Sequence, residues 1–321
     1  MKAIVVNESQ ELIWTETEIG QPGPNEILID VRASAVNRAD LMQRRGLYPP
    51  PQGASQIMGL ECAGIVLSVG SAVSRHTPGD SVCALLAGGG YAEQVLVDEG
   101  SAISIPEGID YESAAALPEV FATAWLNLFI EAGLQPGERV VLHAGASGVG
   151  TAGIQLCRAF GAECFVTAGG SNKIRACLDL GAAGGHDRRS GSFLAGLNAL
   201  WPDGADVILD PVGGQYLSDN LDALRMNGRL VLIGLMGGAA SEINLAKLMM
   251  KRLKVVGSTL RTRSLSEKTS VMAELEQYVW PKISQGEIKP IIHEIFPMDR
   301  AEEAQALVAS DVTIGKVILK V

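Results

Sequence analysis

A glycine-rich turn follows an apolar run and precedes a small-residue helix in residues 140–160. The segment reads VVLHAGASGVGTAGIQLCRAF, with Gly145, Gly148 and Gly150 in a G-x-x-G-x-G spacing. Glycines let the backbone approach a diphosphate closely, and the start of a helix offers free N–H groups and a partial positive charge. The order strand, turn, helix therefore predicts a dinucleotide site. The alternative is a glycine-softened turn in an unrelated strand–helix unit.

The residues beyond this turn indicate which dinucleotide binds. In NAD-binding units a carboxylate about 20 residues past the glycines accepts from the ribose 2′-hydroxyl. Residues 167–176 contain no carboxylate. Gly169, Ser171 and Lys173 stand there instead, and Arg188 follows one unit later. Small residues and cations suit a 2′-phosphate, so we predict NADPH rather than NADH. The alternative for Lys173 is an ordinary solvated helix residue.

Composition restricts the class of protein. The chain has 321 residues, 47% of them apolar and 19% charged, which is enough apolar sequence for two cores. A net charge of −10 excludes a nucleic-acid-binding protein, which would need clustered Lys and Arg. The five cysteines form no CxxC pair and are expected to be buried in a reducing compartment, not in disulfides or a zinc site. They are Cys62, Cys83, Cys157, Cys164 and Cys177.

No segment predicts export or membrane insertion. The apolar run before Asn7 and Glu8 is only four residues long (residues 3–6), too short for a signal peptide. Residues 140–157 carry no charge, but the glycine turn and the change from strand to helix argue against a membrane span. We therefore expect a cytoplasmic protein without a membrane partner.

The pattern of predicted secondary structure changes along the chain. Residues 1–115 alternate short apolar runs with turns, which predicts a compact and largely antiparallel β domain. From about residue 117 strands and helices alternate, which predicts a parallel, doubly wound sheet. Its expected strands are 139–143, 164–167, 184–187, 206–210, 229–234 and 253–258. A long helix at 266–285, a strand, a short helix at 300–310 and a closing strand at 316–321 are expected to return to the first domain.

This arrangement resembles the medium-chain dehydrogenase/reductase superfamily over the whole chain. Asn37 stands where zinc alcohol dehydrogenases carry a catalytic cysteine, and Leu60 stands where they carry a histidine ligand. Zinc needs about four Cys, His or carboxylate ligands, so the chain is similar to the zinc-free quinone oxidoreductase branch. Four segments resemble its p53-inducible quinone oxidoreductase type. They are residues 37–44, 48–51, 235–238 and 260–263.

The resemblance implies a fold and a set of site residues. The fold is a GroES-like β domain (residues 1–118 and 261–321) and a Rossmann domain (residues 119–260). Asn37 and Tyr48 are expected to orient cofactor or substrate oxygens. Their alternatives are a turn residue bonding its own backbone and a surface-loop tyrosine. The other expected cofactor contacts are Thr123, Ala146, Ser147, Gly148, Val149, Gly169, Ser171, Lys173, Arg188, Gly234, Leu235, Met236, Leu260 and Arg261. Related proteins carry a tyrosine at Arg188, and an arginine is the better phosphate partner.

With neither metal ligands nor a flavin motif, the expected chemistry is hydride transfer from NADPH to an already electrophilic acceptor, a quinone. An NADPH-dependent reductase of enone or alkenal double bonds, and a non-enzymatic NADPH-binding protein, share every motif named.

The four histidines show no partner pattern, and His143 is expected to line the core or the cofactor site. Residues 229–234 are expected to form the last-but-one strand of the sheet, near an edge through which two chains form a homodimer.

Overall fold

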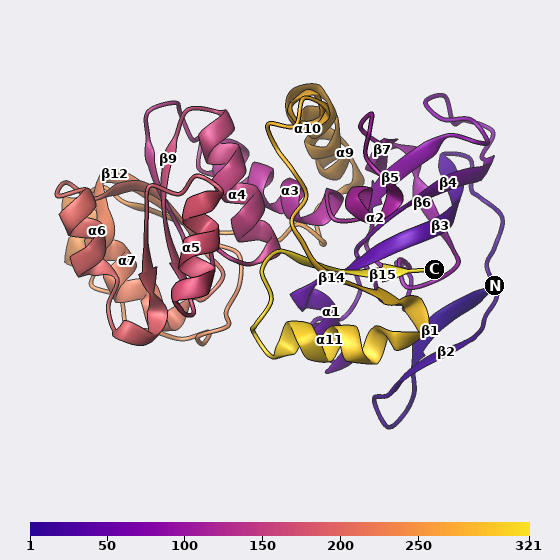
Figure 1. The fold of residues 1–321 in the computed structure, drawn as a ribbon, viewed down its shortest axis with the longest axis horizontal. Coiled ribbons are helices and arrows are strands. Elements are labelled where there is room, and N and C mark those ends of the chain that lie inside the picture. The colour runs from indigo at the N-terminus through magenta and orange to yellow at the C-terminus, as the bar shows by residue number, and fades with distance from the viewer. The chain divides into compact units, whose positions relative to one another are not determined.

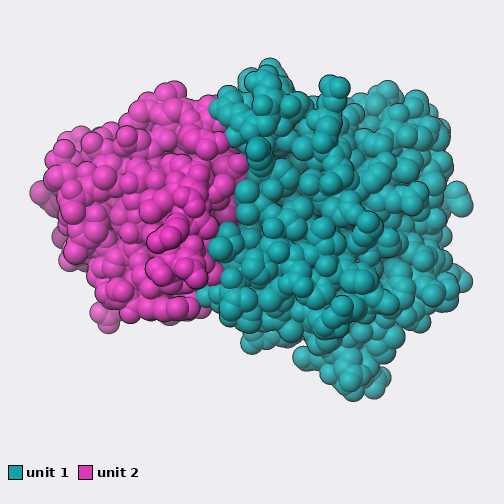
Figure 2. Space-filling model, viewed as in Figure 1, with its two compact units in different colours: residues 1–122, 260–321 teal, residues 123–259 magenta.

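The computed structural model describes residues 1–321, which divide into two compact units (Figures 1 and 2). Unit 1 comprises Met1–Ala122 and Leu260–Val321, and unit 2 comprises Thr123–Thr259. The first boundary falls inside the helix Pro118–Trp125 (α3). Residues 119–122 therefore group with unit 1, whereas the sequence predicts them in the dinucleotide-binding domain.

Unit 1 contains a two-stranded hairpin and a seven-stranded sheet. Its strands are Lys2–Val6 (β1), Leu12–Glu16 (β2), Glu26–Val36 (β3), Glu61–Val69 (β4), Ser81–Leu85 (β5), Gln94–Asp98 (β6), Ala102–Ser104 (β7), Ile292–Pro297 (β14) and Lys316–Lys320 (β15). The sheet runs β14-β15-β3-β4-β5-β7, with β6 also paired to β3. Every pair is antiparallel except β14 with β15.

Strand β3 is longer than its sequence pattern predicts. The alternation of apolar and polar residues indicates a strand over residues 26–31, but β3 continues to Val36. Its second half pairs with β15, in the register Val36 with Val317. Both faces of that half are covered, so its side chains are nearly all buried and the period-2 signal disappears. The return of the tail to the first domain, as predicted, is what extends the strand.

The helices of unit 1 are Arg38–Arg44 (α1), Tyr111–Ala114 (α2), Leu265–Glu274 (α9), Trp280–Ser284 (α10) and Ala301–Ala309 (α11). The helix expected over 266–285 is interrupted, because Leu275–Val279 adopts π-helical geometry just before Pro281. A proline cannot donate the regular backbone hydrogen bond, which is a common reason for such a change. Helix α11 packs against β15 and α1 (Figure 1).

Unit 2 is a six-stranded parallel sheet with helices between its strands. The strands are Arg139–Leu142 (β8), Glu163–Ala168 (β9), Gly184–Asp187 (β10), Ala205–Asp210 (β11), Leu224–Leu232 (β12) and Lys254–Gly257 (β13). The helices are Gly148–Ala159 (α4), Ser171–Asp179 (α5), Leu194–Leu200 (α6), Leu217–Ala223 (α7) and Leu245–Met250 (α8). The order β10-β9-β8-β11-β12-β13 confirms that residues 229–234 form the last-but-one strand, and β13 is the edge.

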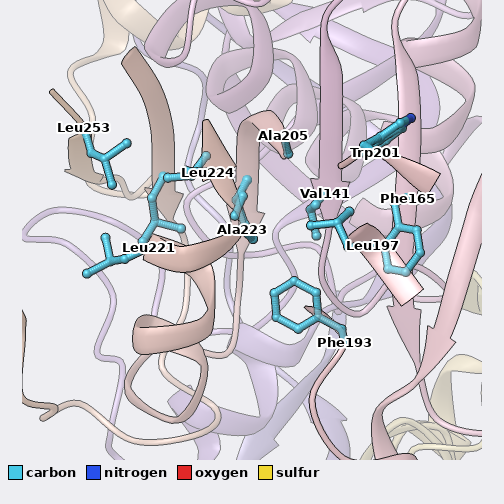
Figure 3. Close-up of a cluster of buried hydrophobic side chains, with 12 residues drawn as sticks. Val141, Phe165, Phe193, Leu197, Trp201, Ala205, Leu221, Ala223, Leu224 and Leu253 are labelled. Atoms are coloured by element: carbon cyan, nitrogen blue, oxygen red, sulfur yellow. The ribbon is translucent and has the colours of Figure 1, made fainter. Parts of the chain in front are cut away.

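One core of unit 2 lies between this sheet and its helices. Phe165 of β9 faces Trp201, with ring centres 6.4 Å apart, and Phe193 and Leu197 pack beside them (Figure 3). Burying a side chain of this size contributes about 1.5–3 kcal/mol, so this cluster fixes the strands whose ends carry the site.

All five cysteines are buried and free, as predicted. One helical stretch, Tyr111–Glu131, is long and apolar enough to cross a membrane by length and composition alone. Within it, 78% of the most apolar window is buried inside the protein. That burial is typical of a core helix, since a membrane span exposes its apolar surface to lipid.

Candidate active site

The glycine-rich turn of unit 2 is closed so tightly that side chains would not fit. A Cβ on Gly150 would lie 2.5 Å from the carbonyl oxygens of Ala144 and Gly145. A Cβ on Gly145 would lie 2.6 Å from Cβ of Val166 on the neighbouring strand. Ala144 itself has a left-handed φ of 54°, a conformation that costs a non-glycine residue some strain. The predicted role of these glycines, close backbone approach, fits this geometry.

The turn ends in a helix start that presents free donors. Ser147 is the N-cap of α4, and its hydroxyl accepts from the N–H of Gly150 at 3.1 Å. The N–H groups of Gly148 and Val149 precede the first intrahelical bond, so the helix itself gives them no acceptor. Together with the helix dipole they form a cradle for an anion. The predicted contacts Ser147, Gly148 and Val149, with Ala146 before them, are therefore brought together.

Two arginines cover the glycines at the end of β9. Arg188 Nε lies 3.2 Å from the position that a Cβ on Gly169 would take, and an Arg189 guanidinium nitrogen lies 3.3 Å from that of Gly170. Asp187 holds this turn, because its Oδ1 accepts from the N–H of Gly170 and of Arg189, both at 3.0 Å. Those hydrogen bonds, Arg189 first and then Gly170, lower the pKa of Asp187.

Lys173 lies in the first turn of α5 and is only 8% exposed, so it is not the solvated residue of the alternative interpretation. Ser171 opens the same helix and is exposed. Among the other predicted contacts, Gly234 lies so close to Pro211 that a Cβ would stand 2.7 Å from its carbonyl oxygen. Leu235 and Met236 follow it in an exposed loop. Thr123, the remaining predicted contact of unit 2, is buried.

A buried network that the sequence did not predict joins the ends of three strands. His143 Nε2 lies 2.7 Å from Asn220 Oδ1, and Asn220 Nδ2 donates to Asp210 at 2.8 Å. The amide oxygen of Asn220 must therefore accept from the imidazole N–H. His143 Nδ1 in turn accepts from the hydroxyl of Thr167 at 2.9 Å. Burial lowers the pKa of His143 and keeps the ring neutral.

The polar network of unit 1 is charged. Asn37 lies between β3 and α1 and is 7% exposed. Its Oδ1 accepts from Nζ of Lys316 at 2.6 Å, and its Nδ2 donates to Oε1 of Glu61 at 2.9 Å. Lys316 and Glu61 form an ion pair at 2.9 Å, with both side chains buried. The amide of Asn37 is therefore bound to two charges, unlike the turn residue of the alternative interpretation.

Asp40, at the start of α1, is completely buried beside this network. It accepts from the N–H of Asn37 at 2.7 Å, the hydroxyl of Tyr91 at 3.0 Å and the N–H of Gly59 at 3.2 Å. Burial raises the pKa of Asp40 to about 6, although all three hydrogen bonds oppose that shift. Asp40 thus fixes the backbone of Asn37 while the ion pair fixes its side chain.

Tyr48 is held by Arg261. The Arg261 guanidinium lies 5.4 Å from the centre of the Tyr48 ring, within range of a cation–π contact. Arg261 also donates to Ala87 O at 2.8 Å, to Gln43 Oε1 at 2.7 Å and to Tyr48 O at 3.3 Å. Burial raises the pKa of Tyr48, which Arg261 opposes and Glu119 reinforces. The phenol therefore stays protonated and can donate.

A small cavity lies within unit 1, lined mainly by leucines. Leu60 and the predicted contact Leu260 line it, with Arg261, Glu119 and Lys268 at its border. Leu60 is buried at the position where the resembling zinc enzymes carry histidine. The N–H of Glu119 donates to Oε2 of Glu61 at 2.9 Å, which links the cavity wall to the network around Asn37. Nowhere in residues 1–321 do three or more His, Cys, Asp or Glu side chains gather as a metal-binding group.

Sequence reasoning missed Glu61, Lys316 and Asp40 in unit 1 and Thr167, Asn220 and Asp210 in unit 2. Glu61 directly follows Leu60, but its role depends on Lys316, and a lysine that opens a strand gives no sign of burial. Thr167, Asn220 and Asp210 are brought to His143 by the order of the parallel strands, which single residues do not reveal.

Comparison with known proteins agrees with this architecture. Residues 23–107 match the family model described as alcohol dehydrogenase GroES-like domain, and residues 148–277 match the one described as zinc-binding dehydrogenase. Quinone oxidoreductase of Rattus norvegicus is 31% identical over 99% of this chain and 97% of its own length. The synaptic vesicle membrane protein VAT-1 homolog of Homo sapiens is 30% identical over 93% of this chain and 79% of its own length.

Among solved structures, Escherichia coli quinone oxidoreductase complexed with NADPH superposes with a TM-score of 0.86 at 29% identity. The superposition covers 100% of this chain and 99% of that one. The expected GroES-like domain and Rossmann sheet are thereby confirmed. The chain belongs to the medium-chain dehydrogenase/reductase superfamily, in its quinone oxidoreductase and VAT-1-like branch, and is an NAD(P)-dependent oxidoreductase of that family.

Proposed function

We propose that this protein is a zinc-independent, NADPH-dependent quinone oxidoreductase of the p53-inducible type. The observation that carries the proposal is the chemistry around Asn37. An amide and the apolar Leu60 stand at the two positions where the resembling zinc enzymes carry cysteine and histidine, and the one carboxylate at Asn37, that of Glu61, is already paired with the ammonium of Lys316. Such a donor set does not suit Zn²⁺, so the acceptor must already be electrophilic.

The dinucleotide fits the groups that unit 2 presents. The helix start at Gly148 suits the diphosphate, and the guanidinium groups of Arg188 and Arg189 suit a 2′-phosphate, which accepts charge-assisted hydrogen bonds. Escherichia coli quinone oxidoreductase, with the same fold, was solved with NADPH. When bound, NADPH supplies a hydride equivalent to an electron-poor carbon.

The residues of unit 1 then orient the acceptor and exclude water. The protonated Tyr48 phenol offers a hydrogen bond to a quinone oxygen, and Asn37 offers an amide whose orientation is fixed. Arg261, which contacts the Tyr48 ring, and Glu119, whose N–H is bound to Glu61, line the small leucine-rich cavity of unit 1, and apolar surroundings strengthen hydrogen bonds. Because reduction makes the quinone ring aromatic, orientation without metal activation suffices.

The experiment that tests the reaction follows NADPH oxidation with ortho-quinones, para-quinones and enones. We expect turnover with quinones to exceed turnover with enones in kcat/KM. The reverse order would assign the protein to double-bond reduction, and no turnover with any acceptor would leave a non-enzymatic NADPH-binding protein. Dialysis against a strong chelator should leave activity unchanged, whereas loss of activity that zinc restores would overturn the metal-free mechanism.

Cofactor choice is tested separately. We expect Arg188→Ala and Lys173→Ala to weaken NADPH binding by about 1.5–3 kcal/mol, the usual value of a hydrogen bond to a charged group, with NADH binding nearly unchanged. Arg175→Ala is the matched control, since Arg175 lies on α5 but is exposed and not among the proposed contacts. Equal losses for both cofactors would show that neither residue binds the 2′-phosphate.

For assembly and location we propose a cytoplasmic homodimer, without a membrane or nucleic-acid partner. The edge strand β13 exposes Val255, and Met249 and Met250 of α8 are 70% and 69% exposed. An apolar edge strand favours pairing with a second chain. Mass measurement at micromolar concentration should give twice the chain mass of 33.7 kDa. A mass of one chain would contradict the dimer.

A further inference from the structure

The ion pair beside Asn37 contacts neither cofactor nor acceptor in the proposal above, yet all its hydrogen-bonding contacts lie within the site. Lys316 has three ammonium protons, and all three are taken. They go to Val36 O at 2.9 Å, Asn37 Oδ1 at 2.6 Å and Glu61 Oε1 at 2.9 Å. Both oxygens of Glu61 are also used: Oε1 contacts Lys316 and accepts from Asn37 Nδ2, each at 2.9 Å, and Oε2 accepts from the N–H of Glu119 at 2.9 Å.

This arrangement permits only one orientation of the Asn37 amide. In the observed orientation the amide oxygen faces a cation and the amide nitrogen faces an anion. A flipped amide would place N–H groups against the ammonium and the oxygen against the carboxylate, so both contacts would become repulsive. A neutral hydrogen-bond partner, which donates and accepts through one hydroxyl, would allow both orientations.

One of the two N–H donors of the Asn37 amide makes only a weak hydrogen bond. The second hydrogen of Nδ2 has only Ala35 O nearby, at a long 3.4 Å. Because that contact is long, an oxygen brought closer to Nδ2 would replace Ala35 O as the acceptor of this proton. A carbonyl oxygen that gains negative charge as hydride arrives would accept it, and a preoriented donor helps such an oxygen most in the transition state.

We propose that Lys316, acting with Glu61, is the positioning residue that holds Asn37 with its N–H toward the acceptor's carbonyl oxygen. The inference rests on the proposed function of Asn37 in acceptor reduction. It assigns to the Lys316–Glu61 pair more than a structural role, because a merely structural pair would affect stability and leave the amide orientation unchanged.

The central variant is Lys316→Met, which keeps the length of the side chain and removes its charge. We expect kcat with a quinone to fall at least tenfold while KM for NADPH changes less than twofold. Lys316→Arg, which keeps the charge, should restore part of kcat. The double variant Glu61→Gln/Lys316→Met leaves no uncompensated buried charge, so it should fold and still show the loss if the single variant does not fold.

A double-mutant cycle separates positioning from general damage. In an Asn37→Ala background, Lys316→Met should change kcat less than twofold, although it still lowers the melting temperature. The control is Lys282→Met, which removes another lysine ion pair of unit 1, with Glu287 at 3.0 Å, and should leave kcat unchanged. An equal fall of kcat in both backgrounds, or an unchanged kcat in Lys316→Met, would overturn the proposal.

A readout independent of turnover keeps this test distinct from that of the proposed function. With ¹⁵N-asparagine labelling, the Asn37 side-chain amide should give two resolved proton signals with slow exchange in the wild type. In Lys316→Met both signals should shift and exchange faster. Unchanged signals would refute the positioning role even if quinones are reduced, and shifted signals in an enzyme without quinone turnover would refute only the proposed reaction.

Discussion

The two units of this protein bury polar networks of opposite character. In unit 2, a neutral histidine, an amide and a hydroxyl connect the ends of β8, β9 and β11, and a single carboxylate, Asp210, closes the chain. In unit 1, a lysine, a glutamate and an aspartate are enclosed around one asparagine. The first network fixes loops whose backbone N–H groups face a ligand, and the second fixes a side chain.

This difference indicates how each unit should respond to change. The candidate cofactor site of unit 2 consists of backbone N–H groups, whose positions depend on close approach of the surrounding segments. Added side-chain volume should therefore lower the stability of unit 2 most. A side chain fixed by charges depends on ionisation, so unit 1 should respond to lost charge and to pH. Four experiments, from the largest expected effect to the smallest, test this contrast.

Added volume in the glycine turn should have the largest effect. Gly150→Ala would place a methyl group 2.5 Å from two backbone oxygens that cannot move aside. We expect a loss of about 3 kcal/mol or more in unfolding free energy, with cofactor binding abolished. The control is Gly153→Ala in the same helix, where the new Cβ meets side-chain methyl groups alone, those of Leu142 at 3.2 and 3.4 Å and one of Leu128 at 3.8 Å. Urea unfolding and cofactor titration of both variants decide it; equal losses would contradict a steric requirement specific to the turn.

Ionisation of Asp40 should produce the next largest effect, in unit 1. Its pKa is raised from 3.8 to about 6 in the folded state, so the folded protein takes up a proton before the unfolded chain as pH falls. This group's contribution to stability is therefore greatest below pH 3.8 and is lost as pH rises through 6, by about 3 kcal/mol in total. We expect the unfolding free energy of the wild type minus that of Asp40→Asn, measured from pH 4.5 to 7.5, to increase as pH falls. A constant difference would show that Asp40 titrates normally.

Removing one link of the unit 2 network should cost less. Asn220→Ala leaves the His143 N–H and one oxygen of Asp210 without their partner. Leaving these two buried polar groups without partners should lower the unfolding free energy by about 2 kcal/mol, after the surrounding structure has relaxed. We expect that loss in urea unfolding at pH 7, and an equal loss at pH 8, because burial lowers the pKa of His143 below its usual 6.5. A loss that differs between pH 7 and 8 would indicate that the network is charged.

The smallest effect should come from the Tyr48 hydroxyl. Tyr48→Phe keeps the ring under Arg261 and removes one neutral hydrogen bond. We expect kcat/KM for quinones to fall by an amount equal to about 0.5–1.5 kcal/mol, with stability unchanged. Tyr48→Ala should cost more, since the ring also covers Arg261. Wild-type kinetics in both variants would place Tyr48 outside the site.

The sequence predicted those features that depend on neighbours along the chain. The alternation of apolar runs and helices predicted the six parallel strands of unit 2, although not their full order, and Gly145 and Gly150 predicted the glycine turn. By contrast, the second half of β3 and the burial of Lys316 depend on a strand pairing between residues nearly 300 positions apart, Val36 with Val317. Hydrophobic periodicity contains no record of such a pairing, so the ion pair that orients Asn37 became visible only in three dimensions.

The position of Lys316 in the chain also determines when the site can form. A ribosome completes all of unit 2 before it synthesises β15, so the nucleotide-binding sheet can fold while the other site is unfinished. Until β15 emerges, residues 33–36 are an unpaired strand edge and Glu61 is a carboxylate without its cation. A premature stop between residues 260 and 316 would thus yield a chain with an intact dinucleotide sheet but an open, charged core in unit 1. Such a chain would expose an unpaired strand edge and an unpaired carboxylate, which favours association with other chains and degradation.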